Sequence, residues 1–121
     1  MLVPQIKLFD NHPANRYHRA MDKKEIKRAV EQAIKTMPQG GAIQRVRLFG
    51  SHLHGNATNK SDVDLLVDFN ESAQIGLFDL VHIQDKFAES LGAEVDLGTP
   101  EGLSKYIRNR VLAEAEILYE R

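Results

Sequence analysis

The sequence contains no cysteine, no long hydrophobic run and no recognisable export signal. Without cysteine among its 121 residues, the chain offers neither a disulfide framework nor a thiolate metal site. No apolar stretch approaches the length that spans a bilayer. The N-terminus also lacks the basic-then-apolar order of a signal peptide. We therefore expect a cytoplasmic protein without membrane segments.

Internal repeats and low-complexity segments are absent too, and the length suggests one domain with a modest core. A hydrophobic content of 42% excludes wholesale disorder. Residues 11–15 (Asn-His-Pro-Ala-Asn) interrupt any regular element near the start. We expect residues 1–20 to form an N-terminal extension, flexible or packed on a partner, and residues 21–121 to form the domain.

Charge is distributed unevenly along a chain whose net charge is only −1. Residues 1–60 hold 11 Lys or Arg against 4 Asp or Glu, whereas residues 61–121 hold 5 against 13. The acidic half suits a divalent cation, and the basic half suits a triphosphate or an acidic partner. For most single charges, however, a solvated surface is the simpler interpretation, so direct nucleic-acid binding is not expected.

Two segments have clear helical periodicity. Residues 22–37 place apolar side chains every three to four positions, with Asp22 as a predicted N-cap and Pro38 as a stop. Residues 77–91 repeat the pattern at Leu77, Leu80, Val81, Gln84, Phe87, Ala88 and Leu91, and Gly92 ends it. Thr99 and Pro100 are typical of a helix start. The final helix is predicted to bury Leu103, Ile107, Val111, Leu112, Ala115 and Leu118.

A pair of carboxylates stands at the start of a predicted strand. Residues 63–69 have the apolar, β-branched composition of a buried strand, and residues 44–49 predict another. Because alternate side chains of a strand share a face, Asp62 and Asp64 should point the same way. Two neighbouring carboxylates repel each other unless a cation lies between them. Mg²⁺ suits this site, since it prefers oxygen ligands, and Mn²⁺ is the alternative.

Gly50 and Ser51 precede these carboxylates by ten residues and end the first predicted strand. Glycine allows close approach of a ligand, and the amides of a short helix starting at Ser51 would favour an anion. Ser61 would contact phosphate or simply cap the strand. A phosphate site beside metal-binding carboxylates is typical of phosphoryl or nucleotidyl transfer. His52 and His54 also read as a His-x-His metal pair, but the nearby hard carboxylates disfavour that interpretation.

The order Gly50-Ser51, ten residues, Asp62-Val63-Asp64 resembles the signature of the polymerase-beta-type nucleotidyltransferase superfamily. The short length is similar to that of the minimal nucleotidyltransferases, the antitoxin halves of HEPN–MNT toxin–antitoxin pairs. That family carries a third carboxylate on a later strand, which residues 94–97 offer as Asp96. The resemblance extends from about Met21 to the C-terminus and implies an α/β fold, a small mixed sheet backed by helices.

The resemblance also implies an activity. Gly50, Ser51, Ser61 and Lys60 would bind the nucleotide, and Asp62, Asp64 and Asp96 would bind Mg²⁺ and act in catalysis. The chain would transfer AMP from ATP to a tyrosine of a cognate HEPN ribonuclease toxin and neutralise it within a hetero-oligomer.

One position departs from the resembling pattern. Family members usually carry an arginine before the glycine at position 55, where this chain has His54. A neutral imidazole does not replace a guanidinium on phosphate unless it is protonated, so we expect activity that is weaker or more pH-dependent, unless Lys60 or Arg47 compensates. Two alternatives therefore stay open. One is an antitoxin that masks its toxin by binding alone, and the other is a small-molecule nucleotidyltransferase, which usually needs a further domain.

Overall fold

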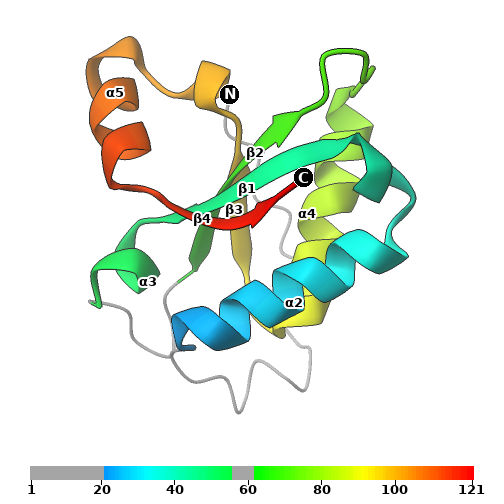
Figure 1. Ribbon diagram of the computed structural model, residues 1–121, viewed down its shortest axis with the longest axis horizontal. Helices are drawn as coiled ribbons and strands as arrows, with labels where there is room; N and C mark the ends of the chain where they lie inside the picture. Colours follow the sequence, from blue (N-terminus) through cyan, green and yellow to red (C-terminus); the bar gives the residue numbers. More distant parts are fainter. Residues whose placement is uncertain (1–20, 56–61) are drawn as a thin grey trace.

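The computed structural model describes residues 21–55 and 62–121, which form a four-stranded sheet with helices around it (Figure 1). This arrangement confirms the predicted α/β class. The elements are, in order, α2 (Lys23–Thr36), η1 (Pro38–Ala42), β1 (Ile43–Phe49), α3 (Ser51–His54), β2 (Val63–Phe69), α4 (Leu77–Leu91), β3 (Val95–Gly98), η2 (Pro100–Gly102), α5 (Lys105–Glu114) and β4 (Glu116–Glu120).

The sheet is mixed, with the strand order β3-β2-β1-β4. Strand β1 runs antiparallel to both β2 and β4, whereas β2 and β3 run parallel. The parallel register places Asp64 opposite Asp96. The antiparallel register places Phe49 opposite Asp64. Strand pairing therefore brings the end of β1 and the starts of β2 and β3 to one edge of the sheet.

Helix α2 begins and ends where the sequence predicts. The Asp22 side chain accepts a hydrogen bond from the Glu25 backbone N–H at 2.8 Å, which satisfies one free amide of the first turn. Pro38 and the glycines after it form a short 3₁₀ helix instead of a further α-turn. The predicted apolar stripe faces the core, with Ile26, Val30, Ala33, Ile34 and Met37 all buried.

Helix α4 confirms the predicted bounds and most of the predicted buried stripe, with Gln84, Phe87, Ala88 and Leu91 buried, but it differs at two positions. Ile83 is fully buried although the predicted stripe omits it, while Leu77 remains 48% exposed. The Gln84 side chain is buried because its oxygen accepts a hydrogen bond from the Leu97 backbone N–H at 3.3 Å. That bond attaches α4 to β3, the strand that carries Asp96.

The C-terminal prediction is wrong in three respects. The predicted burial of Ile107, Val111 and Leu112 is not found, because no residue of α5 is buried. Thr99 and Pro100 start only the three-residue η2, and α5 begins later, with Ser104 as its N-cap. The chain then leaves the helix at Ala115 and forms β4, so Leu118 is buried from a strand. The spacing of the apolar residues is compatible with a helix, but pairing with the open edge of β1 satisfies backbone groups that a longer helix would leave exposed.

The predicted extension, residues 1–20, lies outside the described residues, and the domain boundary at residue 21 stays a prediction. Within residues 21–55 and 62–121, every helix is too short or too polar to cross a bilayer.

Candidate active site

Strand register brings the three predicted carboxylates together. Asp62 immediately precedes β2, Asp64 lies on β2, and Asp96 lies directly across from Asp64 on β3. Val63 and Val95, between and beside them, point into the core, where both are buried. Because side chains alternate along a strand, the three carboxylates share the opposite face. The predicted shared orientation of Asp62 and Asp64 follows from this arrangement.

The carboxylates interact strongly enough to disturb the ionisation of Asp64. Burial raises the pKa of Asp64, and the charges of Asp96 and Asp62 raise it further, to about 7. The cause is physical: a desolvated carboxylate next to two other negative charges is costly to ionise. A cation at this position would lower the repulsion, and such perturbed groups are common at functional sites.

Gly50 lies against the Asp64 carboxylate. Its backbone has φ +78° and ψ −154°, a conformation that residues with a side chain rarely adopt. A Cβ atom added to Gly50 would stand 2.1 Å from Asp64 Oδ2, well inside contact distance. Gly50 therefore serves two purposes, because it turns the chain from β1 into α3 and leaves room for the carboxylate.

A buried histidine connects α3 with the start of β2. His52 is only 5% exposed, and its Nδ1 lies 3.2 Å from the backbone oxygen of Asp62. A carbonyl oxygen can only accept, so Nδ1 carries the proton. The bond ties the Gly50-Ser51 turn to the carboxylates. The sequence suggests His52 only as a metal ligand, and no local pattern signals this positioning contact.

His54 has a different partner. Its Nε2 lies 3.4 Å from Glu114 Oε2 on α5, and both side chains are about half exposed. The two histidines of the His-x-His pair are therefore engaged with separate groups, which disfavours a shared metal. Arg47 does not substitute for the missing arginine, because its Nη1 donates to Asp68 Oδ2 at 2.9 Å. Lys60 and Ser61 lie outside the described residues.

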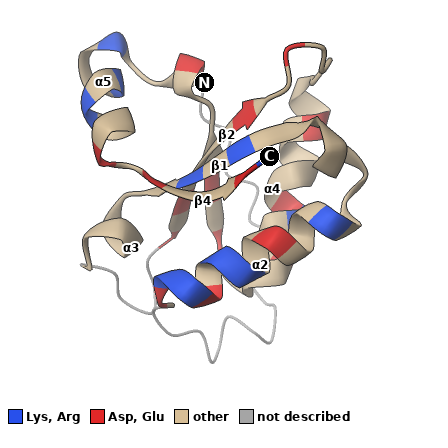
Figure 2. Ribbon diagram, viewed as in Figure 1, with Lys and Arg blue, Asp and Glu red and all other residues tan. Residues whose placement is uncertain are grey.

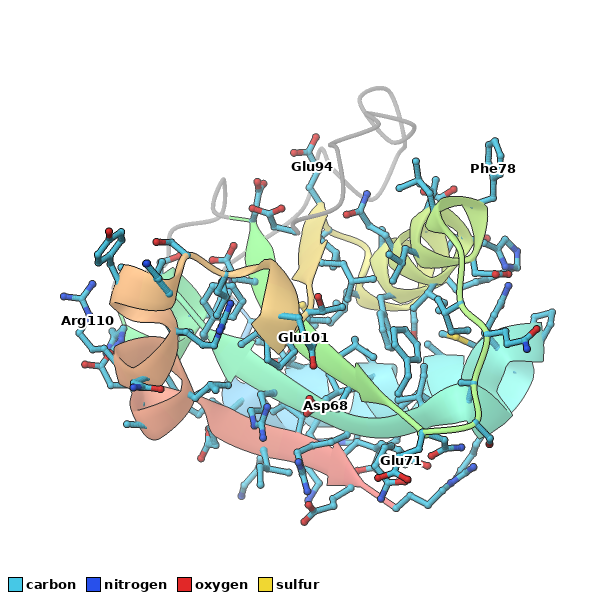
Figure 3. All side chains as sticks on the ribbon, turned by 90° about the horizontal axis from the view of Figure 1, so that it is seen from above. Asp68, Glu71, Phe78, Glu94, Glu101 and Arg110 are labelled. Atoms are coloured by element: carbon cyan, nitrogen blue, oxygen red, sulfur yellow. The ribbon has the colours of Figure 1, made fainter. Side chains whose placement is uncertain are left out.

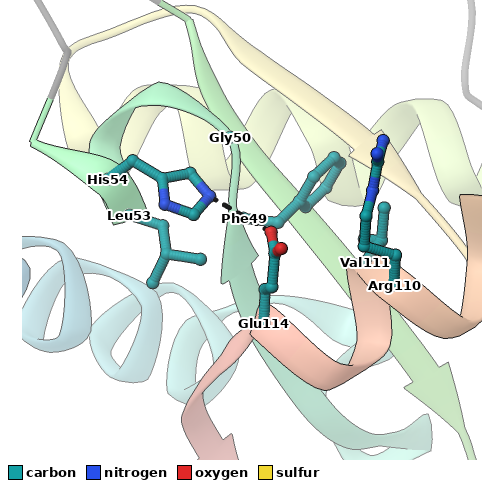
Figure 4. A pocket seen from close by; sticks show the side chains of 7 residues that line it. All are labelled: Phe49, Gly50, Leu53, His54, Arg110, Val111 and Glu114. Atoms are coloured by element: carbon teal, nitrogen blue, oxygen red, sulfur yellow. Dashed lines mark ion pairs between the residues drawn. The ribbon is translucent and has the colours of Figure 1, made fainter.

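A pocket of about 380 Å³ opens beside Gly50, between β1, α3 and α5 (Figure 4). Its walls are partly apolar and partly charged, and they comprise Phe49, Gly50, Leu53, His54, Arg110, Val111 and Glu114. Phe49 is also the cross-strand neighbour of Asp64, so the pocket adjoins the carboxylates. No sequence pattern predicts that α5 forms a wall of this pocket, because its position depends on how the C-terminal segment folds back.

The donor set suits a hard divalent cation that arrives with its substrate. Within residues 21–55 and 62–121, no three acidic or histidine side chains converge tightly enough to enclose a metal ion. Mg²⁺, however, commonly takes one or two protein carboxylates and completes its shell with water and phosphate oxygens. The repulsion centred on Asp64 is the feature that such an ion would relieve.

Comparison with known protein families identifies the family of this chain. The family model described as a nucleotidyltransferase domain matches residues 23–118, which include β1, β2, β3, the first part of β4 and all three predicted carboxylates. The chain belongs to the nucleotidyltransferase-domain family. Among the relatives of this nucleotidyltransferase is the protein adenylyltransferase MntA of Thermococcus cleftensis. The two are 31% identical over 90 residues, which cover 74% of this chain and 89% of the relative.

Solved structures share the fold. A minimal nucleotidyltransferase is 34% identical, with a TM-score of 0.63 over 78% of this nucleotidyltransferase and 94% of that chain. A toxin–antitoxin structure with AMP-PNP has a TM-score of 0.60 at 21% identity, over 84% of this chain and 75% of that one. A complex of a tri-AMPylated Shewanella oneidensis HEPN toxin with an MNT antitoxin has a TM-score of 0.58 at 18% identity, over 82% and 73%.

Proposed function

We propose that this nucleotidyltransferase is an antitoxin that transfers AMP from ATP to a tyrosine hydroxyl of a cognate HEPN ribonuclease toxin. The observation that carries the proposal is the carboxylate cluster at Gly50, in which burial and the charges of Asp96 and Asp62 raise the pKa of Asp64. The relative named as a protein adenylyltransferase and the AMPylated toxin of the Shewanella complex support the choice of a protein acceptor.

The nucleotide is assigned to the turn between β1 and α3. Gly50 and Ser51 present backbone amides at the start of α3, next to the Asp64 carboxylate. Lys60 and Ser61, which follow in the sequence, complete the proposed phosphate contacts. ATP is the proposed nucleotide, in keeping with the AMP-PNP of the neighbouring toxin–antitoxin structure.

Asp62, Asp64 and Asp96 are the proposed ligands of Mg²⁺, which when bound would neutralise phosphate oxygens during transfer. The tyrosine oxygen attacks the α-phosphorus in line, and the new P–O bond forms as the bond to the β-phosphate oxygen breaks. Pyrophosphate leaves with the bonding electrons. The proton of the hydroxyl passes to the Asp96 carboxylate, which lies across from Asp64.

A second candidate is an antitoxin that neutralises its toxin by binding alone. The pairing of His54 with Glu114 favours it, because this pair occupies the side chain at the position where relatives usually carry a phosphate-binding arginine. Parent and Asp64→Asn proteins distinguish the two. A catalytic antitoxin loses neutralisation in the variant while still binding the toxin, whereas a binding-only antitoxin neutralises equally well with either residue.

Intact mass spectrometry of the HEPN protein encoded beside this chain tests the proposal. The protein is incubated with this nucleotidyltransferase, ATP and Mg²⁺, and modified peptides are then sequenced. We expect a gain of one or more AMP groups on tyrosine, and no gain when Asp62 and Asp64 are both changed to Asn. A stable complex without any mass gain would favour binding-only neutralisation. Transfer to a small molecule instead would contradict the proposed acceptor.

A further inference from the structure

Helix α5 packs only loosely on the described part of the chain, with Val111 and Leu112 partly buried. None of its ten residues is buried. Tyr106 is 86% exposed and Ile107 is 38% exposed, although both are large apolar side chains. A helix of this length is marginal in water unless packing stabilises it. In Figure 1, α5 stands apart from α2 and α4, the helices that cover the core.

Polar contacts nevertheless fix the position of α5. The Arg108 guanidinium donates to the backbone oxygens of Pro100 and Leu103, both at 2.9 Å, and to that of Glu101 at 3.2 Å. Ser104 caps the first turn by accepting from the Tyr106 backbone N–H. The helix is therefore held mainly at its N-terminal end, with the pair of Glu114 and His54 at its other end, and none of these contacts uses Tyr106 or Ile107.

We call Lys105, Tyr106, Ile107 and Arg110 the outer face of α5. Tyrosine and arginine are the residues most enriched among binding hot spots, and isoleucine adds apolar area. Lys105 Nζ lies 5.4 Å from the centre of the Tyr106 ring. Figure 2 shows Lys and Arg along this helix, although the second half of the sequence is acidic overall. The composition fits a protein surface with an acidic patch around an aromatic-binding hollow.

The outer face of α5 is continuous with the candidate active site. Arg110 belongs to this face and also lines the pocket beside Gly50, with Val111 and Glu114 of the same helix. Gly50 in turn contacts the Asp64 carboxylate. A macromolecule seated on α5 would therefore reach the reaction centre along the pocket. A small acceptor would fit within the pocket and would not need Tyr106, which projects outside it.

We propose that the outer face of α5 is the docking surface for the acceptor protein and positions the acceptor hydroxyl at the carboxylates. The inference rests on the proposed function, since it takes the acceptor to be a folded protein. It adds two points to that function. The acceptor protein binds the outer face of α5, and it does so with an acidic patch that receives Tyr106.

The chain offers a matched control in Phe78. This side chain is 90% exposed, close to the 86% of Tyr106, but it lies on α4. Figure 3 places Phe78 and Arg110 at opposite ends of the molecule. If any exposed aromatic residue were enough to bind the acceptor, Phe78→Ala would weaken binding as much as Tyr106→Ala. The proposal requires that only the α5 substitution does so.

The kinetic test uses the full chain with the HEPN protein encoded beside it as acceptor. AMP transfer is measured against acceptor and ATP concentration for the parent, Tyr106→Ala, Tyr106→Ala/Ile107→Ala and Phe78→Ala. We expect the α5 variants to raise the KM for the acceptor about tenfold or more, with the KM for ATP unchanged. Phe78→Ala should behave as the parent. An unchanged acceptor KM in the double α5 variant would overturn the proposal.

A binding measurement separates this proposal from the proposed function. If the parent transfers no AMP, calorimetric titration of the same variants with the HEPN protein still reports docking. Tenfold weaker binding by the α5 variants would then support the surface while the AMP-transfer assignment fails. Equal binding would overturn the surface.

Hydroxyl-radical footprinting of Tyr106 completes the test. We expect the ring to be oxidised in the isolated chain and protected in the complex. Protection already present in the isolated chain would mean that the chain itself or a second copy covers this face, which also overturns the proposal.

Discussion

The two faces of the sheet differ in almost every respect. One face consists mostly of apolar side chains buried beneath α2 and α4, among them Val46, Leu48, Val63, Leu65, Val67, Val95 and Leu97. The exception is the β4 edge of this face, where Glu116 lies across from Leu48 and pairs with Lys23 of α2. The other face carries Arg45, Arg47, Phe49, Asp64, Asp68 and Asp96, none of them fully buried. Among the described strands, this face buries Leu66 and its cross-strand partner Gly98, and Leu66 lies apart from the main core cluster.

The contrast shows how a small domain separates stability from chemistry. Alternation along each strand sends neighbouring residues to opposite faces, so β2 contributes Leu65 to the core and Asp64 to the site. The core face provides the burial that holds the strands in register. The charged face tolerates repulsion at Asp64 because that register is fixed from the other side. Substitutions on the two faces should therefore have different consequences.

The largest loss of stability is expected on the core face. Leu65→Ala removes a fully buried side chain and should lower the free energy of unfolding by about 2 to 5 kcal/mol. Denaturant titration measures this change. The folded fraction should keep normal AMP-transfer activity per molecule, because Leu65 does not reach the site. A loss below about 1 kcal/mol would mean that Leu65 is not part of the tightly packed core.

The next largest loss of stability is expected at Gly50, which follows the end of β1. Gly50→Ala forces a side chain into a conformation typical of glycine and toward Asp64 Oδ2, with an expected cost of about 1 to 3 kcal/mol. AMP transfer should fall as well, since the carboxylate must move. Gly41→Ala is the matched control, because no atom lies within 4 Å of its added Cβ. Equal thermal stability of the two variants would contradict the close contact.

Ionisation of Asp64 on the charged face should make the free energy of unfolding depend on pH. The folded state raises the pKa of Asp64 from 3.8 to about 7, so it binds this proton more tightly than the unfolded chain does. The resulting destabilisation is absent below pH 4, grows between pH 4 and 7, and is complete above pH 7. Partial exposure of Asp64 reduces its size to about 1 to 2 kcal/mol at neutral pH.

Asp64→Asn removes this titration. Compared with the parent in the presence of a chelator, the variant should gain stability as pH rises from 4 to 8, measured by thermal melts across the range. Mg²⁺ should stabilise the parent more than the variant, because it favours the ionised carboxylate. Parallel pH profiles for the two proteins would mean that the site does not perturb Asp64.

The smallest loss of stability is expected from the exposed ion pairs of Arg45 on the charged face. Arg45 pairs with both Glu120 on β4 and Asp68 on β2. Glu120→Gln should change the free energy of unfolding by less than about 1 kcal/mol, because exposed ion pairs are screened by solvent. Urea titration at low and high salt measures it. A loss as large as that of Leu65→Ala would show that these ion pairs, and not only the core, hold β4 in place.

Much of the fold follows from local patterns. The apolar stripe and caps locate α2, and Gly92 locates the end of α4, because helix starts and stops are encoded by neighbouring residues. Strand β4 does not follow in this way. Ala115 and Leu118 continue a helical spacing, and only the unpaired edge of β1 makes a strand the better structure there.

The candidate site, like the fold, is only partly predicted by local sequence patterns. Alternation along β2 predicts that Asp62 and Asp64 share a face, and the family resemblance points to Asp96. The contact between Gly50 and Asp64, the bond from His52 to the Asp62 carbonyl, and the pocket wall from α5 all depend on long-range pairing. No local pattern encodes such contacts, so the sequence identifies the reactive groups but not the residues that position them.

We propose that the carboxylates of the charged face carry out AMP transfer. The most direct test compares Asp64→Asn with Asp68→Asn, a substitution of the same type on the same strand and face. Transfer of AMP to the HEPN protein is followed with ATP and Mg²⁺. We predict that Asp64→Asn abolishes transfer while the folded structure is retained, and that Asp68→Asn keeps activity near that of the parent. Full activity of Asp64→Asn, or equal losses in both variants, would contradict the claim.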